Sequence, residues 1–349
     1  MPSDFAQWYR NHRAKVDTAV TAMRPLLAKP LPDVRGTLRR TKVFGAEARR
    51  TGDAYQVILS AALPAILHYT FNNLFRDPNY LPGIGNAASE IPYRDLRSGI
   101  PFSLPRHVRV ETAICVIAQL SRPLDDDRAQ AAALMAELAT AFCVYHEVAH
   151  IGLGHIDALS EQHSNGRLLE IVPSNNAPQG RAAEIRRVWE YEADLVAANM
   201  LLQDMVSPGA EETFAVVYGS DNDYTPLGRV QAMLGAALVV FLLISQATPT
   251  SRQTHPDPLV RFVAIANDAA AAMVEQHPQF ALTHEEMQEA VNDVAVMTVE
   301  RWSALQTPSR YRSLAGRMLG ARPQVEKLER LRSELQASYR GHAYLYPFK

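Results

Sequence analysis

The segment from Asp125 to His150 constrains the fold of this chain more than any other. Its three aspartates, at 125–127, can cap free backbone N–H groups and complement the positive end of a helix. The residues that follow are rich in alanine, which has the highest helix propensity. The segment therefore predicts one long helix through His150, and Gly152 and Gly154 are placed to end it.

Two histidines and a glutamate lie near the end of this predicted helix, in the pattern His146-Glu147-x-x-His150. Residues four apart lie about one turn apart on the same helix face, so both imidazoles can bind one tetrahedral ion. Glu147 adjoins the first ligand and can reach a water on that ion without binding the ion itself. The pattern predicts a Zn²⁺ site with its own general base, although Mn²⁺ and Co²⁺ also suit such ligands. The alternative is an amphipathic helix with ordinary surface or core histidines.

A second helix is predicted over residues 181–205, where apolar residues recur at helical spacing. Glu190 and Asp194 share one face of it, because they are four residues apart. A catalytic zinc usually has three protein ligands and one open position, so Glu190 is the expected third ligand. Asp194 is placed to accept the free N–H of a ligating histidine, and we expect that histidine to be His146. Glu192 points elsewhere and is assigned to an exposed acidic face.

These elements together resemble the gluzincin pattern of the HtpX and Ste-type metallopeptidases. Their order and the further His155 also resemble the Lit phage-exclusion peptidases, a cytosolic bacterial family. The likeness covers about residues 128–265 and rests on His146-Glu147-x-x-His150, His155, Glu190-x-x-Ala193-Asp194 and Thr254-His255-Pro256-x-x-x-x-Arg261.

The resemblance implies a zincin-like core with two metal-bearing helices. It also implies that His255 lies near the active site, where it approaches the open metal position or stabilises an oxyanion. Arg261 would then anchor the turn; the alternative is a helix-start histidine with a salt-bridging arginine. Residues 107–120 are a candidate for the strand that binds substrate by backbone pairing, although Glu111 could equally begin a helix.

Two further side chains near the histidine pair have open roles. Cys143 lies one helical turn before His146 and could approach the metal, but burial of a free thiol is the more common outcome. His155 follows the end of the predicted helix. A structural hydrogen bond is the favoured role for it, and direct ligation is the alternative.

The predicted fold class is mainly α with a small β component (α+β). Further helices are expected over residues 5–23, 226–245, 284–305 and 323–339, and a strand or helix start leads into a helix over 54–75. Residues 77–105 are expected to be irregular, and the polar connection 160–180 is a candidate gate for the cleft. We predict an N-terminal arm and helical or irregular region (1–105), a metallopeptidase core (106–275) and a C-terminal helical region (276–349).

Composition restricts the location and the partners. A formal net charge of −2 gives no overall field that attracts nucleic acid or an anionic membrane, and the basic clusters at 35–50 and 317–332 are interpreted as solvated helix faces. Only Cys115 and Cys143 are present, which favours a reducing compartment. The strongest apolar run, 232–244, is shorter than the ~20 residues of a membrane span. The start has no signal-peptide core, so we expect a cytoplasmic protein.

The predicted function is zinc-dependent hydrolysis of a peptide bond in a cytosolic protein by metal-activated water. On the Lit resemblance, the substrate would be a translation factor and the role phage defence. The alternatives are a repressor-cleaving or housekeeping metallopeptidase, or a catalytically silent zinc-binding protein whose C-terminal helices bind a partner. No pattern predicts the oligomeric state.

Overall fold

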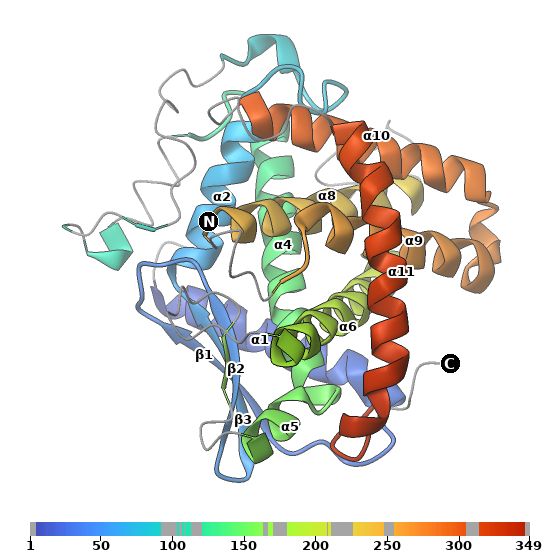
Figure 1. The fold of residues 1–349 in the computed structure, drawn as a ribbon. Coiled ribbons are helices and arrows are strands. Elements are labelled where there is room, and N and C mark those ends of the chain that lie inside the picture. Colours follow the sequence, from blue (N-terminus) through green and yellow to red (C-terminus); the bar gives the residue numbers. More distant parts are fainter. Residues whose placement is uncertain are drawn as a thin grey trace.

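The computed structural model describes residues 5–91, 103–104, 107, 109–112, 121–162, 167–169, 180–207, 209–210, 226–247, 255–304 and 314–345. Over these residues the chain is a bundle of α-helices built around one central helix, with a small β-sheet packed near one end of the bundle (Figure 1). The predicted class, mainly α with a small β component, is confirmed.

The central helix is α4 (Asp126–Gly152), and it forms for the predicted reasons. The Asp125 side chain caps it by accepting a hydrogen bond from the Arg128 backbone N–H at 3.0 Å. From Phe142 to Gly152 every residue is buried, because α4 contacts α1 (Phe5–Met23), α2 (Ala62–Phe75), α6 (Gly180–Val206) and α8 (Pro226–Ala247). A helix surrounded by protein can place polar groups in a site shielded from water.

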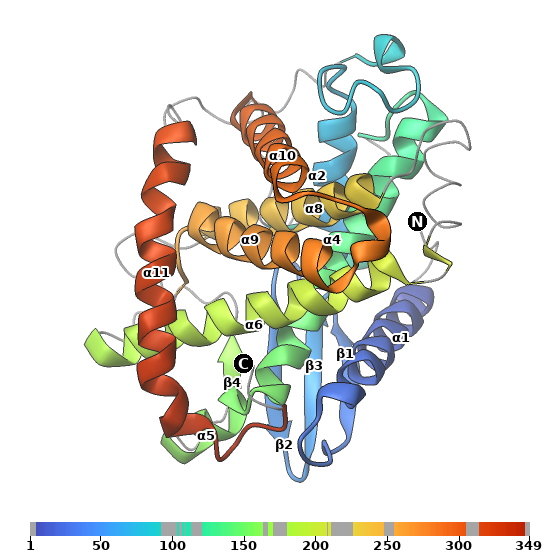
Figure 2. The same cartoon turned by 90° about the vertical axis from the view of Figure 1, so that its right-hand side faces the viewer.

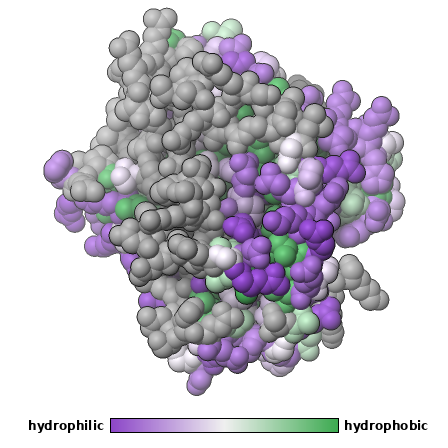
Figure 3. Space-filling view, in the orientation of Figure 1, coloured by the Kyte–Doolittle hydropathy of each residue, from purple (hydrophilic) through white to green (hydrophobic). Residues whose placement is uncertain are grey.

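The helices of the C-terminal half cover α4 and one another. Helix α9 (Pro258–Gln276) contacts α6 and α8, and α10 (His284–Ala304) contacts α8 and α9. Helix α11 (Leu314–Tyr339) runs across the ends of α6 and α9 and packs against both (Figure 2). Its outer face, with Glu326, Lys327, Arg330 and Glu334, is exposed and hydrophilic (Figure 3).

Among the described residues the sheet has four strands in the order β1-β3-β2-β4. Strands β1 (Val34–Arg39) and β3 (Ala54–Ser60) are parallel, whereas β2 (Ala46–Thr51) is antiparallel to β3 and to β4 (Arg167–Leu169). The turn between β2 and β3 contains Gly52 at φ +61°, a conformation that favours glycine.

The strands that form near the start of the region 1–105 were not predicted from the sequence. Residues 5–23 form the predicted helix, but β1 and β2 follow it and join β3 in the sheet. The basic cluster at 35–50 therefore lies largely on strands and not on a solvated helix face. These two strands are stabilised by pairing with β3, which lies farther along the chain, so the local sequence did not indicate them.

Several other segments differ from their predictions or fall outside the described residues. A three-residue strand, β4, forms within the connection 160–180, and residues 163–166 and 170–179 lie outside the described residues. In the segment 107–120, residues 110–112 are helical, and most of the remainder, with Cys115, lies outside the description. Helix α11 starts at Leu314, earlier than predicted, and includes Pro323. The short helices are η1 (Arg24–Leu26), η2 (Ala87–Ser89), α5 (His155–Gln162) and η5 (Pro278–Phe280).

The buried apolar residues of the described chain form one connected cluster, which extends from Val16 to Leu345. It contains residues from each of the three predicted regions, 1–105, 106–275 and 276–349. The central region therefore shares its core with the segments on either side of it.

Among the residues that the structure describes, two helices, α4 and α8, are long and apolar enough to cross a membrane by length and composition alone. In the fold, 78% of the most apolar window of α4 and 83% of that of α8 are buried inside the protein. The core helix of a soluble protein passes the same test, so packing between helices accounts for the apolar character of both.

Candidate metal centre

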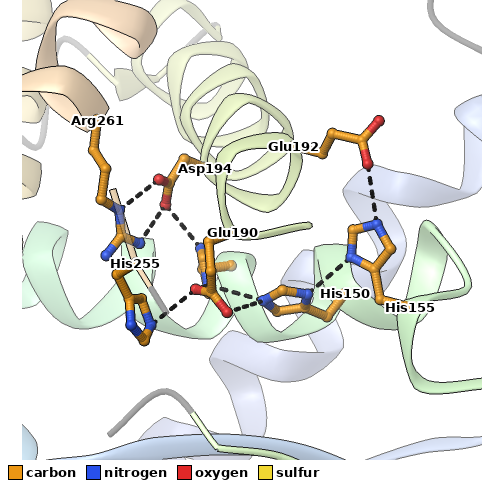
Figure 4. A network of polar contacts seen from close by, with 8 residues as sticks. His150, His155, Glu190, Glu192, Asp194, His255 and Arg261 are labelled. Atoms are coloured by element: carbon orange, nitrogen blue, oxygen red, sulfur yellow. Dashed lines mark hydrogen bonds and ion pairs between the residues drawn. The ribbon is translucent and has the colours of Figure 1, made fainter. Parts of the chain in front are cut away.

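The structure brings His146 and His150 of α4 together with Glu190 of α6. Figure 4 shows His150 beside the carboxylate of Glu190. The Nε2 atoms of the two histidines are 3.0 Å apart. Glu190 Oε2 lies 3.2 Å from His146 Nε2, and Glu190 Oε1 lies 3.7 Å from His150 Nε2. All three side chains are buried, and their ligand atoms lie within 4.8 Å of one another. Within the described part of the chain, this is the group of side chains that could hold a metal ion.

The three donor atoms suit a tetrahedral ion. Ligands at about 2.0 to 2.1 Å from such an ion stand about 3.3 Å from one another. The two Nε2 atoms are 3.0 Å apart, and the Glu190 carboxylate lies 3.2 Å from His146 through Oε2 and 3.7 Å from His150 through Oε1. Two imidazole nitrogens and one carboxylate oxygen are also the donor types of catalytic zinc sites. The residues therefore fit a divalent ion.

The second ring nitrogen of His146 contacts Asp194, the contact that the sequence spacing predicts. His146 Nδ1 lies 2.9 Å from Asp194 Oδ1. If Nδ1 carries the proton, Nε2 offers its lone pair to the metal position. Asp194 is buried, and Arg261 binds it with Nε at 2.6 Å and Nη2 at 2.7 Å. Arg261 therefore donates two hydrogen bonds to the carboxylate that contacts His146.

Burial and neighbouring charges shift the pKa values of the three side chains in different directions. Burial alone would lower the pKa of His146, but its hydrogen bonds to Asp194 and Glu190 raise that pKa well above the ordinary value. Burial alone would raise the pKa of Glu190, but His255 and His146 hold it well below its usual range. Burial lowers the pKa of His150 well below its ordinary value. A cation between the carboxylate and the imidazoles fits these surroundings.

His255 lies beside the carboxylate of Glu190, with its Nε2 atom 3.1 Å from Glu190 Oε2 (Figure 4). It comes from the segment that enters α9. There Asp257 caps the helix by accepting from the Leu259 backbone N–H at 2.9 Å, and Pro258 occupies the first turn. The structure thus brings His255 to the predicted ligands, while Thr254 lies outside the described residues.

Glu147 and Cys143 are both buried on α4, at 1% and 0% exposure. Glu147 follows His146 directly in the sequence and is shielded from bulk water. Cys143 is a buried free thiol, and the described ligand group does not include it.

The assignment of Glu192 to an exposed face is wrong. Glu192 is 1% exposed, and its Oε2 atom lies 3.2 Å from His155 Nε2. His155 in turn contacts His150, with 2.9 Å between the two Nδ1 atoms. His155 therefore contacts a candidate ligand by a hydrogen bond, but it is not a member of the candidate ligand group. Trp189 and Tyr191, which lie three and one positions before Glu192, were a usable signal, because large aromatic residues indicate that this part of α6 is buried.

Two residues near the chain end also reach this network and were missed. Arg332 Nε lies 3.1 Å from Glu192 Oε1, and the Tyr339 hydroxyl donates a hydrogen bond to Glu192 Oε2. Arg332 belongs to the cluster 317–332 that was assigned to a solvated face, and its side chain is 22% exposed. Nothing in the sequence spacing relates these residues to the histidine pair, because they lie more than a hundred positions away.

The comparisons with curated proteins and with solved structures each give no match. A comparison with protein families gives one, peptidase U49, whose model matches residues 106–281. The matched span is just over half of the chain and contains His146, Glu147, His150, Glu190 and His255. Members of a peptidase family are hydrolases that act on peptides. On the strength of this span, the chain belongs to the peptidase U49 family.

Proposed function

We propose that this chain is a zinc-dependent endopeptidase that cleaves a protein substrate in the cytoplasm. The observation that carries the proposal is the convergence of His146, His150 and Glu190 from two separate helices into one buried group. Membership of a peptidase family supports the reaction class.

In the proposed mechanism His146 and His150 present their Nε2 atoms, and Glu190 a carboxylate oxygen, to the ion. When bound, zinc would lower the pKa of a water molecule and polarise the scissile carbonyl. Glu147 takes the proton of the attacking water and delivers it to the leaving amine. His255, which lies beside Glu190, is placed to donate a hydrogen bond to the developing oxyanion.

A catalytically silent zinc protein is the second candidate, and the site argues against it. A structural zinc site usually closes the ion with four protein ligands. Within the described residues the ligand group has three members, and a carboxylate suited to act as a base, Glu147, directly follows the first of them.

A role in phage defence, with a translation factor as the substrate, belongs to the same proposal. Its support is the order of the motifs along the chain, which resembles that of the Lit peptidases. A repressor-cleaving or housekeeping peptidase would use the same chemistry and differ only in the protein that is cleaved.

The Glu147→Gln variant tests the mechanism. Glutamine keeps the size of the side chain but cannot accept the proton, so we expect one zinc ion per chain and a loss of at least about 10²-fold in peptide hydrolysis. His146→Ala and Glu190→Ala should instead lose the zinc. Metal analysis and turnover of a peptide library measure the two properties, and full activity in Glu147→Gln would reject the mechanism.

The substrate is identified by comparing new protein N-termini in cells that express the wild type or Glu147→Gln. Termini that depend on Glu147 mark the cleaved bonds. A translation factor among them supports the defence role, and a transcriptional repressor supports the alternative.

A further inference from the structure

His150 is oriented through an intermediate histidine, whereas His146 contacts a carboxylate directly. Its Nδ1 atom lies 2.9 Å from His155 Nδ1, and His155 Nε2 lies 3.2 Å from Glu192 Oε2. Figure 4 shows this series of contacts running from His150 to Glu192. A carboxylate accepts and does not donate, so the proton of His155 belongs on Nε2.

The remaining protons follow from that assignment. With its proton on Nε2, His155 offers a lone pair at Nδ1 and accepts a hydrogen bond from His150 Nδ1–H. His150 then has a lone pair at Nε2, the atom that faces Glu190 and His146. Glu192 thus selects the tautomer in which His150 can bind a metal ion.

The charge of Glu192 depends on helix α11. Glu192 is 1% exposed, and a buried carboxylate is costly unless it is paired and hydrogen-bonded. Arg332 supplies a cation at 3.1 Å, and Tyr339 supplies a hydroxyl donor.

Aromatic rings hold His155 in place between α6 and α11. Trp189 stacks on the imidazole with 5.0 Å between ring centroids and 13° between the planes. Tyr339 meets the same imidazole edge-on, with centroids 5.4 Å apart. The His155 ring is therefore confined by α11 as well as by α6.

The segment after α11 is also anchored on the end of the metal-bearing helix. The backbone N–H groups of Tyr344 and Leu345 donate to the Gly152 carbonyl at 2.8 and 3.0 Å. Gly154 has φ +76°, and a Cβ atom there would lie 2.4 Å from the His342 carbonyl carbon. The turn that carries His155 is thus packed closely against the C-terminal segment.

We propose that α11 is part of the metal centre, and that Arg332 and Tyr339 are positioning residues that act on His150 through Glu192 and His155. Both lie outside the span 106–281 that matches the peptidase family. The inference rests on the proposed function, because it assigns these residues to the same metal ion.

The test measures the affinity of purified, metal-free full-length protein for Zn²⁺ alone, by competition with a chelator. The double variant Arg332→Gln/Tyr339→Phe removes both α11 contacts, and Glu192→Gln removes the charge that they stabilise. We expect each to bind Zn²⁺ about 10- to 100-fold more weakly than the wild type, the range found for partners of metal ligands.

The matched control is Tyr191→Phe. The Tyr191 hydroxyl also joins α6 to α11, by a hydrogen bond to Glu329 Oε1 at 3.3 Å, but it has no place in the series from His150 to Glu192. This variant should bind Zn²⁺ within about twofold of the wild type. Circular dichroism checks that each protein is folded, and the single variant Tyr339→Phe replaces the double one if the latter unfolds.

A second readout follows the tautomers in protein labelled with ¹⁵N-histidine. The proton should reside on Nε2 of His155 and Nδ1 of His150 in the wild type, and this preference should weaken in the double variant and persist in Tyr191→Phe. Wild-type zinc affinity in folded double and Glu192→Gln variants would overturn this inference and leave the proposed function intact. Failure of the wild type to bind Zn²⁺ would reject both.

Discussion

At the scale of single residues, burial controls which groups carry charge, and His12 shows this away from the metal centre. His12 is 3% exposed, and its Nε2 atom lies 3.3 Å from the Val57 carbonyl oxygen. Burial, aided by the positive charge of Lys15, lowers its pKa to about 4, even though the hydrogen bond to Val57 acts in the opposite direction.

His12 should therefore make stability depend on pH. Between pH 6.5 and 4 the unfolded chain binds a proton at this residue and the folded chain does not, so stability is lost as the pH falls. We expect a loss of about 2 to 3 kcal/mol between pH 7 and pH 4.5 from this residue alone. The glutamine in His12→Gln cannot titrate. Urea unfolding at both pH values should therefore show that this variant loses about 2 to 3 kcal/mol less stability than the wild type on acidification. Equal losses in the two proteins would contradict the assignment.

At the scale of elements, the start of α4 holds the turns that follow α2. Arg128 is fully buried, and its guanidinium donates five hydrogen bonds, at 2.8 to 3.1 Å, to the backbone carbonyls of residues 75, 77, 80, 81 and 84. The same turns contain Leu81 at φ +45°. One side chain of the central helix thus satisfies the carbonyls of an irregular segment.

Arg128→Met should destabilise the protein by at least about 3 kcal/mol, because it leaves several buried carbonyls without donors. Arg122→Met is the control. Arg122 pairs with Asp126 near the same helix start, but both side chains are exposed, at 61% and 81%, and such pairs contribute at most about 1 kcal/mol. Chemical denaturation measures both variants, and similar losses would show that the five hydrogen bonds add little.

At the scale of the whole molecule, the candidate metal centre joins separate parts of the chain. Helix α4 supplies two of its ligands, α6 supplies the third, and α11 reaches the network behind His150. The helices that carry these residues also contribute to one apolar core, which is shared by all three predicted regions. An ion at this site would therefore stabilise the folded molecule as a unit.

Removal of metal should lower the melting temperature. An ion that binds only the folded state adds about 4 kcal/mol when its free concentration is a thousand times the dissociation constant. Thermal unfolding with excess Zn²⁺ and with a strong chelator should differ in the wild type and coincide in His146→Ala. A wild-type melting temperature that is the same with excess Zn²⁺ and with the chelator would contradict the predicted site.

The sequence alone determined the local features of this protein. The bounds of α1, the end of α2 and the capped start of α4 follow from hydrophobic periodicity and capping residues, which act over a few positions. The shared face of His146 and His150, and that of Glu190 and Asp194, follows from helix geometry. These predictions needed no knowledge of where other elements pack.

Only the tertiary structure decided how those faces meet. It brought His255 to Glu190, Arg261 to Asp194, and helix α11 to Glu192, and it built β1 and β2 into a sheet through pairing with β3. An acidic residue on a helix looks the same in the sequence whether water or another helix covers it. The physical reason is that burial and long-range pairing depend on packing between distant segments, which local spacing does not encode.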